Sequence, residues 1–150
     1  MPRTSAASGL VDSLFQLSFL LHKTLARLAA AHDLSIVQMR LLAILRDREP
    51  GMFELAQYLE LEKSSLSGLV DRAAARGLVE RIPSPDDGRA ARIRVTAQGR
   101  RFSRRVERQV NAEVARLVAV LPRADRNRLA SVASQIVTAA GRRLPVAKSA

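Results

Sequence analysis

A lysine and three serines stand close together near the middle of the chain, at Lys63, Ser64, Ser65 and Ser67. A serine hydroxyl both donates and accepts hydrogen bonds, so it can bind a base edge or a phosphate, and a lysine ammonium binds phosphate oxygens. This chemistry requires the first turn of a helix that enters a major groove. Ser64 and Ser65 could instead bind free backbone amides at the start of that helix.

A second candidate is Arg89, which follows the turn-forming run 83–88. An arginine at the tip of a hairpin suits a narrow minor groove, where the negative potential of duplex DNA is strongest. Asp87 stands two residues earlier, where its carboxylate would pair with an arginine and hold the loop instead of facing DNA. Without its surroundings, Arg89 could equally be an exposed side chain on a flexible turn.

The elements that must position these residues form a continuous unit. The pattern predicts in order a helix, a turn, a helix that Gly77 ends, and two strands, over residues 53–59, 60–62, 63–76, 78–82 and 92–95. A helix, a turn, a second helix and a hairpin outline a winged helix-turn-helix. The sequence therefore predicts duplex DNA as the ligand.

Further helices are predicted on both sides of this unit. Residues 10–31 carry leucines every three or four positions, and phenylalanines widen the apolar stripe. Ser35 and Gln38 fit a capping box that opens the next helix. Thr96 can cap a long amphipathic helix, which Pro122 interrupts, and a last helix is expected after residue 125.

The terminal helices carry apolar faces that the small winged unit cannot cover. We expect these faces to pack against each other and against a second copy of the chain. The predicted fold class is mainly α with a small β-hairpin wing (α+β), a winged helix-turn-helix with a helical dimerisation region. The expected parts are a flexible N-terminus, a dimerisation region in two pieces, a DNA-binding domain and a flexible tail, at residues 1–9, 10–33 with 97–141, 34–96 and 142–150.

The composition agrees with a polyanionic partner. The formal net charge is +11, and 22 of the 25 basic residues are arginine, although an arginine-biased genome with a solvated basic surface would give the same charge. Aromatic residues make up 3% of the chain, so the core must consist mainly of Leu, Val, Ile and Ala.

Catalysis and a cofactor find no support in the sequence. The chain has no cysteine, and His22 and His32 are ten residues apart, which is not the spacing of a shared metal site on a helix. No nucleophile elbow, Walker loop or dinucleotide fingerprint occurs. The N-terminus lacks a secretory signal, and charges interrupt the apolar stretch 10–31, so we expect a cytoplasmic protein that is not an enzyme.

From Met39 to Arg105 the sequence resembles the MarR family of bacterial transcription regulators. The resemblance rests on four correctly spaced segments, residues 63–72, 76–81, 83–89 and 95–99. The family's wing pattern is matched by Asp87, Arg89, Arg92 or Arg94, Thr96 and Gly99, with Val95 in place of leucine. Two departures lie in the recognition helix, where Glu62 is a poor N-cap and Gly68 lowers helix propensity.

The resemblance implies a homodimer in which the first helix and the last two pair with their mates. The implied function is a sequence-specific regulator of transcription, most simply a repressor on a palindromic operator. DNA-binding roles then fall on Lys63, Ser64, Ser65, Ser67, Arg72, Arg89 and Arg92, and the wing-fixing role falls on Asp87.

The resemblance also implies that a small aromatic or anionic molecule could release the DNA. Its pocket would lie between the dimerisation helices and the winged domain, lined by Phe15, Phe19, His22, Met39 and Arg40. The same residues could instead be core aromatics, a solvated histidine and a surface charge.

Two other functions remain open from the sequence. One is a ligand-independent DNA-architectural protein, which should lose little affinity when the DNA sequence is scrambled. The other is a basic protein that binds anionic membrane surfaces through amphipathic helices.

Overall fold

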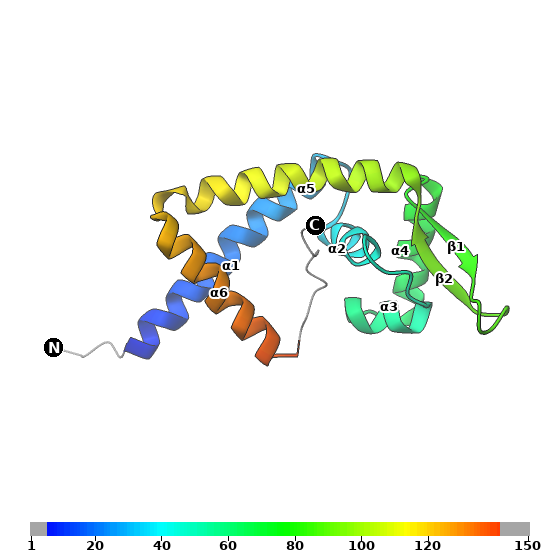
Figure 1. Ribbon diagram of the computed structural model, residues 1–150, viewed down its shortest axis with the longest axis horizontal. Helices are drawn as coiled ribbons and strands as arrows, with labels where there is room; N and C mark the ends of the chain where they lie inside the picture. The colour runs from blue at the N-terminus through cyan, green and yellow to red at the C-terminus, as the bar shows by residue number, and fades with distance from the viewer. Residues whose placement is uncertain (1–5, 142–150) are drawn as a thin grey trace.

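The computed structural model describes residues 6–141. In chain order the elements are α1 (Ala6–Ala30), α2 (Ile36–Leu45), α3 (Met52–Leu59), α4 (Lys63–Ala75), β1 (Val79–Pro83), β2 (Ala91–Val95), α5 (Ala97–Leu117), the short 3₁₀ helix η1 (Val118–Val120) and α6 (Arg123–Ala139). The long α5 runs along one edge of the molecule, with α2–α4 and the hairpin at one end and α1 and α6 at the other (Figure 1). The predicted fold class is confirmed.

Local capping sets several boundaries where the sequence predicts them. The Ser35 side chain accepts from the Gln38 amide while the Gln38 side chain accepts from the Ser35 amide, which confirms the capping box. The Thr96 side chain accepts from the Gly99 amide at 2.9 Å and so opens α5. Gly77 adopts φ 68° after α4, as expected of the residue that ends a helix.

Three helix boundaries differ from the prediction. Helix α1 begins at Ala6, inside the stretch expected to be flexible, of which residues 1–5 lie outside the described part, as does the expected tail 142–150. Helix α5 ends at Leu117 and continues as η1, which ends before Leu121 because this residue, next to Pro122, is extended. Helix α6 begins directly after Pro122, since proline is tolerated at a helix start.

A leucine-rich core holds the winged domain together. Leu41, Leu55, Leu66 and Ile93 are fully buried, and they come from α2, α3, α4 and β2. The two strands pair antiparallel with Val79 opposite Val95. The backbone of Pro50 accepts from the Ile93 amide at 2.9 Å, which attaches the chain before α3 to the outer edge of β2.

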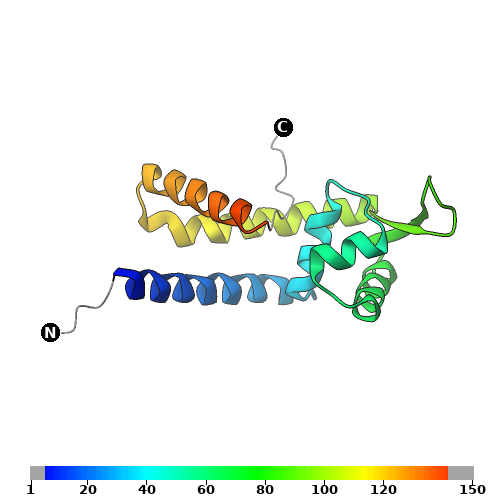
Figure 2. The ribbon, with the colours of Figure 1, turned by 90° about the horizontal axis from the view of Figure 1, so that it is seen from below.

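The other end of the molecule leaves apolar faces open. Every residue of α1 from 10 to 20 is exposed, and no residue of α6, all of which is described, is buried. Figure 2 shows α1 in one layer and α5 with α6 in another. Within one chain the apolar faces of α1 and α6 are therefore open, and their burial against each other and a second copy of the chain stays a prediction. None of the helices in residues 6–141 has the length and apolar character needed to cross a membrane.

The contact between the start of α5 and Leu78, the residue before β1, depends on a missing side chain. A Cβ on Gly99 would collide with the carbonyl oxygen of Leu78, a backbone atom that cannot move aside. We predict that Gly99→Ala lowers the free energy of unfolding by about 1–3 kcal/mol, measured as a shift of the urea midpoint at constant slope. Gly88→Ala is the control, since nothing lies within 4 Å of its added Cβ. An equal midpoint for both variants would contradict the packing argument.

Candidate nucleic-acid interface

The predicted contact residues of α4 lie on its exposed first turns. Lys63, Ser64 and Ser65 are exposed and Ser67 is half-buried, while Leu66 between them is fully buried in the core. Leu66 thus anchors this turn in the core, and the helical spacing leaves the polar side chains on the surface. Gly68 lies on the same stretch, and an added Cβ there would meet only the guanidinium of Arg72 at 3.2 Å.

These hydroxyls are not used for capping. Glu62 stands at the N-cap position and makes no side-chain cap hydrogen bond, as the sequence predicts. Within the described residues, the side chains of Ser64, Ser65 and Ser67 also make no hydrogen bond. The start of α4 therefore presents free amides and free hydroxyls together, a combination that binds anions.

The hairpin tip is held by backbone hydrogen bonds. The Asp87 carboxylate accepts from the Arg89 amide at 3.0 Å, and the Asp87 carbonyl accepts from the Ala90 amide at 3.0 Å. The expected partner of Asp87 is an arginine side chain, but its observed partner is the backbone of Arg89, because the short turn brings that amide closest. The Arg89 guanidinium is left exposed at the tip.

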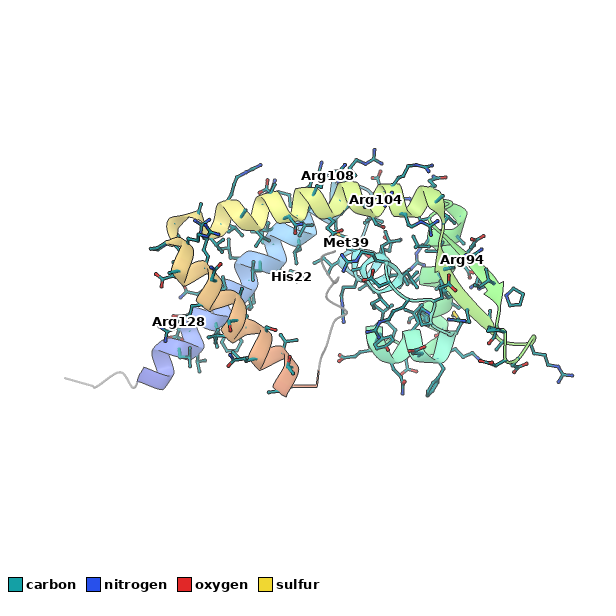
Figure 3. All side chains as sticks on the ribbon, viewed as in Figure 1. His22, Met39, Arg94, Arg104, Arg108 and Arg128 are labelled. Carbon is teal, nitrogen blue, oxygen red and sulfur yellow. The ribbon has the colours of Figure 1, made fainter. Side chains whose placement is uncertain are left out.

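Two ion pairs that the sequence pattern does not predict brace the wing. Arg81 of β1 pairs with Asp71 of α4 at 2.8 Å, which ties the hairpin to the recognition helix. Arg94, labelled in Figure 3, pairs across the strands with Glu80 at 2.8 Å. The second pair follows from the strand register, which places Glu80 opposite Arg94. The first depends on how β1 packs on α4, which no local pattern reveals.

The remaining arginines of the site differ in role. Arg92 is half-buried, and its Nε donates to the carbonyl of Glu49 at 2.6 Å, so it joins β2 to the loop before α3. Arg72 is exposed on α4. Arg76 donates to the carbonyls of Asp33 and His32 and thereby fastens α4 to the end of α1.

The five residues expected to line a ligand pocket do not line one common cavity. Phe15 and Phe19 stack on each other on the exposed face of α1, with ring centroids 6.3 Å apart, and His22 is exposed. Arg40 is half-buried and contacts the Tyr58 carbonyl at 3.4 Å. Of the five residues, only Met39 lines the apolar cavity described next.

This cavity has a volume of about 170 Å³ and lies between α2 and α5. Its walls include Met39, Leu42, Val106 and Val110. The hydroxyl of Ser103 is buried without a hydrogen-bond partner in the part of the chain described here. Arg46 and Glu107, which form an ion pair at 2.7 Å, also line it. Residues 6–141 contain no cluster of three acidic, histidine or cysteine side chains that could hold a metal ion.

A helix-turn-helix followed by a hairpin with a basic tip defines the class of winged helix-turn-helix proteins. Residues 32–90 match the MarR family, and this match covers the helix-turn-helix and the hairpin tip. The winged domain of this chain thus matches the MarR family of transcriptional regulators.

Known proteins are similar to this chain over different lengths. The solved structure of RV1404 from Mycobacterium tuberculosis is 28% identical, with a TM-score of 0.79 over 96% of this chain and 99% of that one. The repressor CouR, solved bound to a 23-mer DNA duplex, is 24% identical, with a TM-score of 0.75 over 91% and 99%. The transcriptional repressor IacR of Pseudomonas putida is 32% identical over 78 residues, 51% of this chain and 47% of that repressor. The match to this curated relative thus spans about half of its length.

The bond that holds the wing tip can be tested directly. Asp87→Ala removes the acceptor of the Arg89 amide, so hydrogen exchange at that amide should accelerate about two- to tenfold, measured by NMR. Asp87→Asn keeps the oxygen and should exchange as slowly as the parent protein. Fast exchange in both variants would mean that the negative charge, and not the hydrogen bond, holds the turn.

Proposed function

We propose that this protein is a homodimeric, sequence-specific regulator of transcription that represses genes from a palindromic operator in the cytoplasm. The observation that carries the proposal is the uncapped start of α4, where the exposed hydroxyls of Ser64 and Ser65 have no partner in the described residues and Lys63 stands beside them. These hydroxyls contribute no hydrogen bond to the fold, whereas a helix that reads DNA needs polar groups at its N-terminus.

Helix α4 would enter the major groove by its N-terminus. The serine hydroxyls would bind base edges, and Lys63 with the free amides would bind phosphates. Gly68 would allow the helix to approach the DNA backbone closely, and the exposed Arg72 would contact that backbone. Two similar proteins agree with this role, since IacR and CouR are both described as repressors and CouR is bound to a DNA duplex.

The wing would place Arg89 in the adjacent minor groove. Its backbone is held by Asp87, and the Arg81–Asp71 pair ties the hairpin to α4, so tip and recognition helix form one unit. We assign Arg92 a positioning role in place of a direct DNA contact, because its guanidinium is engaged with the Glu49 carbonyl.

Dimerisation would use the apolar faces of α1 and α6. Leu14, Leu17, Leu129, Val132 and Ile136 are all exposed in a single chain, and burying such a surface is the main driving force of subunit association. A two-fold dimer presents two recognition helices, which requires an inverted repeat with half-site centres about 10 base pairs apart.

A small molecule would act through the cavity between α2 and α5. The cavity has apolar walls and one unpartnered hydroxyl, that of Ser103, which suits a small aromatic ligand with a single polar group. Because α2 belongs to the winged domain and α5 continues towards α6, such a ligand would change how the two ends of the molecule sit together.

The alternative within DNA binding is an architectural protein without a ligand. It predicts similar affinity for an operator and for a scrambled duplex of equal length and composition. A specificity ratio of about a thousand or more would favour the regulator.

The proposed dimer predicts a sedimenting species of about twice the chain mass. Leu14→Asp combined with Ile136→Asp places charges on both apolar faces and should convert the dimer to a monomer at micromolar concentration. Phe53→Asp on α3 is the control, since its side chain is equally apolar and 79% exposed but lies in the winged domain. A parent protein that sediments as a monomer yet binds a palindrome tightly would refute the dimer.

The wing and the recognition helix should fail in different ways. Arg89→Ala removes a cation from each minor groove, so it should weaken binding to most sequences and reduce the salt slope by about one to two units. Ser65→Ala removes a neutral contact near base edges, so the loss of about 1–3 kcal/mol should fall on the preferred operator and leave the salt slope unchanged. Titration of both variants against operator and scrambled duplexes at several salt concentrations measures both effects.

Each variant can contradict its part of the proposal. Parent-like affinity and slope for Arg89→Ala would mean that the wing does not touch DNA. An equal loss on both duplexes for Ser65→Ala would mean that this serine does not read bases.

A further inference from the structure

Four arginines form a continuous row on the face of α5 that points away from the core. This arginine row consists of Arg101, Arg104, Arg105 and Arg108, all exposed. Their spacing of three and four residues makes them neighbours on one side of the helix. Gly99 and Val106, on the opposite side of α5, are buried. Figure 3 labels Arg104 and Arg108 on this stretch.

Within the described residues, no carboxylate pairs with the row. The two glutamates of α5 are engaged elsewhere, Glu107 with Arg46 and Glu113 with Arg27 and Arg116. Like charges three and four residues apart repel one another and disfavour the helix that carries them. An external anion bound along the row would relieve this repulsion.

The row lies at the far end of α4 from the DNA-reading turn. Arg76, which follows α4, stacks on Phe102 with its guanidinium carbon 5.5 Å from the ring centroid, and Gln98 donates to the Arg76 carbonyl. The row therefore begins beside the C-terminal end of α4, whereas Ser64 stands at its N-terminal end, about 20 Å away along the helix. In Figure 1, α5 and α3 form opposite edges of the winged domain. A straight duplex on the first turn of α4 leaves the row free.

We propose that the arginine row is a second, sequence-independent DNA-binding surface, which holds the phosphate backbone of a DNA segment other than the one read by α4 and the wing. The inference rests on the proposed function, because DNA is the most concentrated polyanion around a protein that is bound at its operator. Arginine forks match phosphate oxygens in bidentate geometry. A hollow of about 280 Å³, lined by Gln98, Phe102 and three arginines of the row, can take such phosphates.

The consequence is that the bound protein can join two DNA segments. Each protomer would hold an operator half-site on one edge and a further segment on the other. The two rows of a dimer would gather flanking or distant DNA around the operator, and this second contact would depend steeply on salt because it consists of charge neutralisation alone.

The test separates the two surfaces. The tightest-binding duplex selected from a random-sequence pool is immobilised and saturated with protein, and capture of a second, scrambled, fluorescent duplex is measured. Arg104→Ala combined with Arg108→Ala should keep the affinity for the first duplex within about twofold but reduce capture of the second about tenfold and flatten its salt slope by about two units. Arg104→Lys with Arg108→Lys keeps the charges and should retain most capture.

The matched control is Arg123→Ala with Arg128→Ala on α6, which removes two exposed arginines that are not neighbours on the helix. It should capture the second duplex as the parent does. Equal capture by the Arg104/Arg108 alanine variant, an equal loss in the control, or binding of phosphatidylglycerol vesicles without capture of a second duplex would overturn the proposal. A random pool that yields no preferred sequence would instead refute the sequence-specific function. In that case a scrambled duplex is immobilised, and capture of a second scrambled duplex still tests the arginine row.

Discussion

The rest of the structure depends on the close contact between the start of α5 and the backbone just before β1. Gly99 allows the helix to meet the Leu78 carbonyl, and Thr96 fastens the same point by donating to the Gly77 carbonyl at 2.6 Å and accepting from the Gly99 amide. This junction sets the direction in which a 21-residue helix leaves the hairpin. Because α5 is long and rigid, its direction decides where α6 lies. Backbone packing at one glycine thus relates the winged domain to the end of the molecule that α1 and α6 form.

The distribution of the carboxylates explains how a basic protein presents its charge. Glu80 and Asp71 pair with arginines inside the winged domain. Glu107 of α5 pairs with Arg46 after α2, and Glu113 of α5 pairs with Arg27 of α1 and with Arg116. These pairs are partly exposed and contribute little stability, so their main effect is on geometry. Arg89 at the wing tip and the arginine row of α5 are among the exposed arginines without an acidic partner in the described residues, so positive charge is concentrated at these places.

Much of this architecture is visible in local sequence signals. The capping box at Ser35, the cap at Thr96, the helix end at Gly77 and the alternation of β2 each depend on residues a few positions apart, so they predict the winged helix-turn-helix. The exposed positions of Lys63 and Ser64 follow from helical periodicity, and that of Arg89 follows from its place in the turn between the two strands. The net charge of +11 indicates a polyanionic partner in the same way.

Contacts between distant segments settled the rest. The partner of Arg92 is the Glu49 carbonyl, and that of Arg81 is Asp71, because the hairpin folds back on the helices. The cavity of about 170 Å³ is lined by Met39 but not by the aromatic residues of α1, because α5 packs against α2 there and α1 does not. The arginine row can be recognised as a surface separate from the start of α4 only when the distance between the two is known. Local periodicity assigns a residue to one face of its own helix, whereas the element packed on that face is chosen by long-range packing.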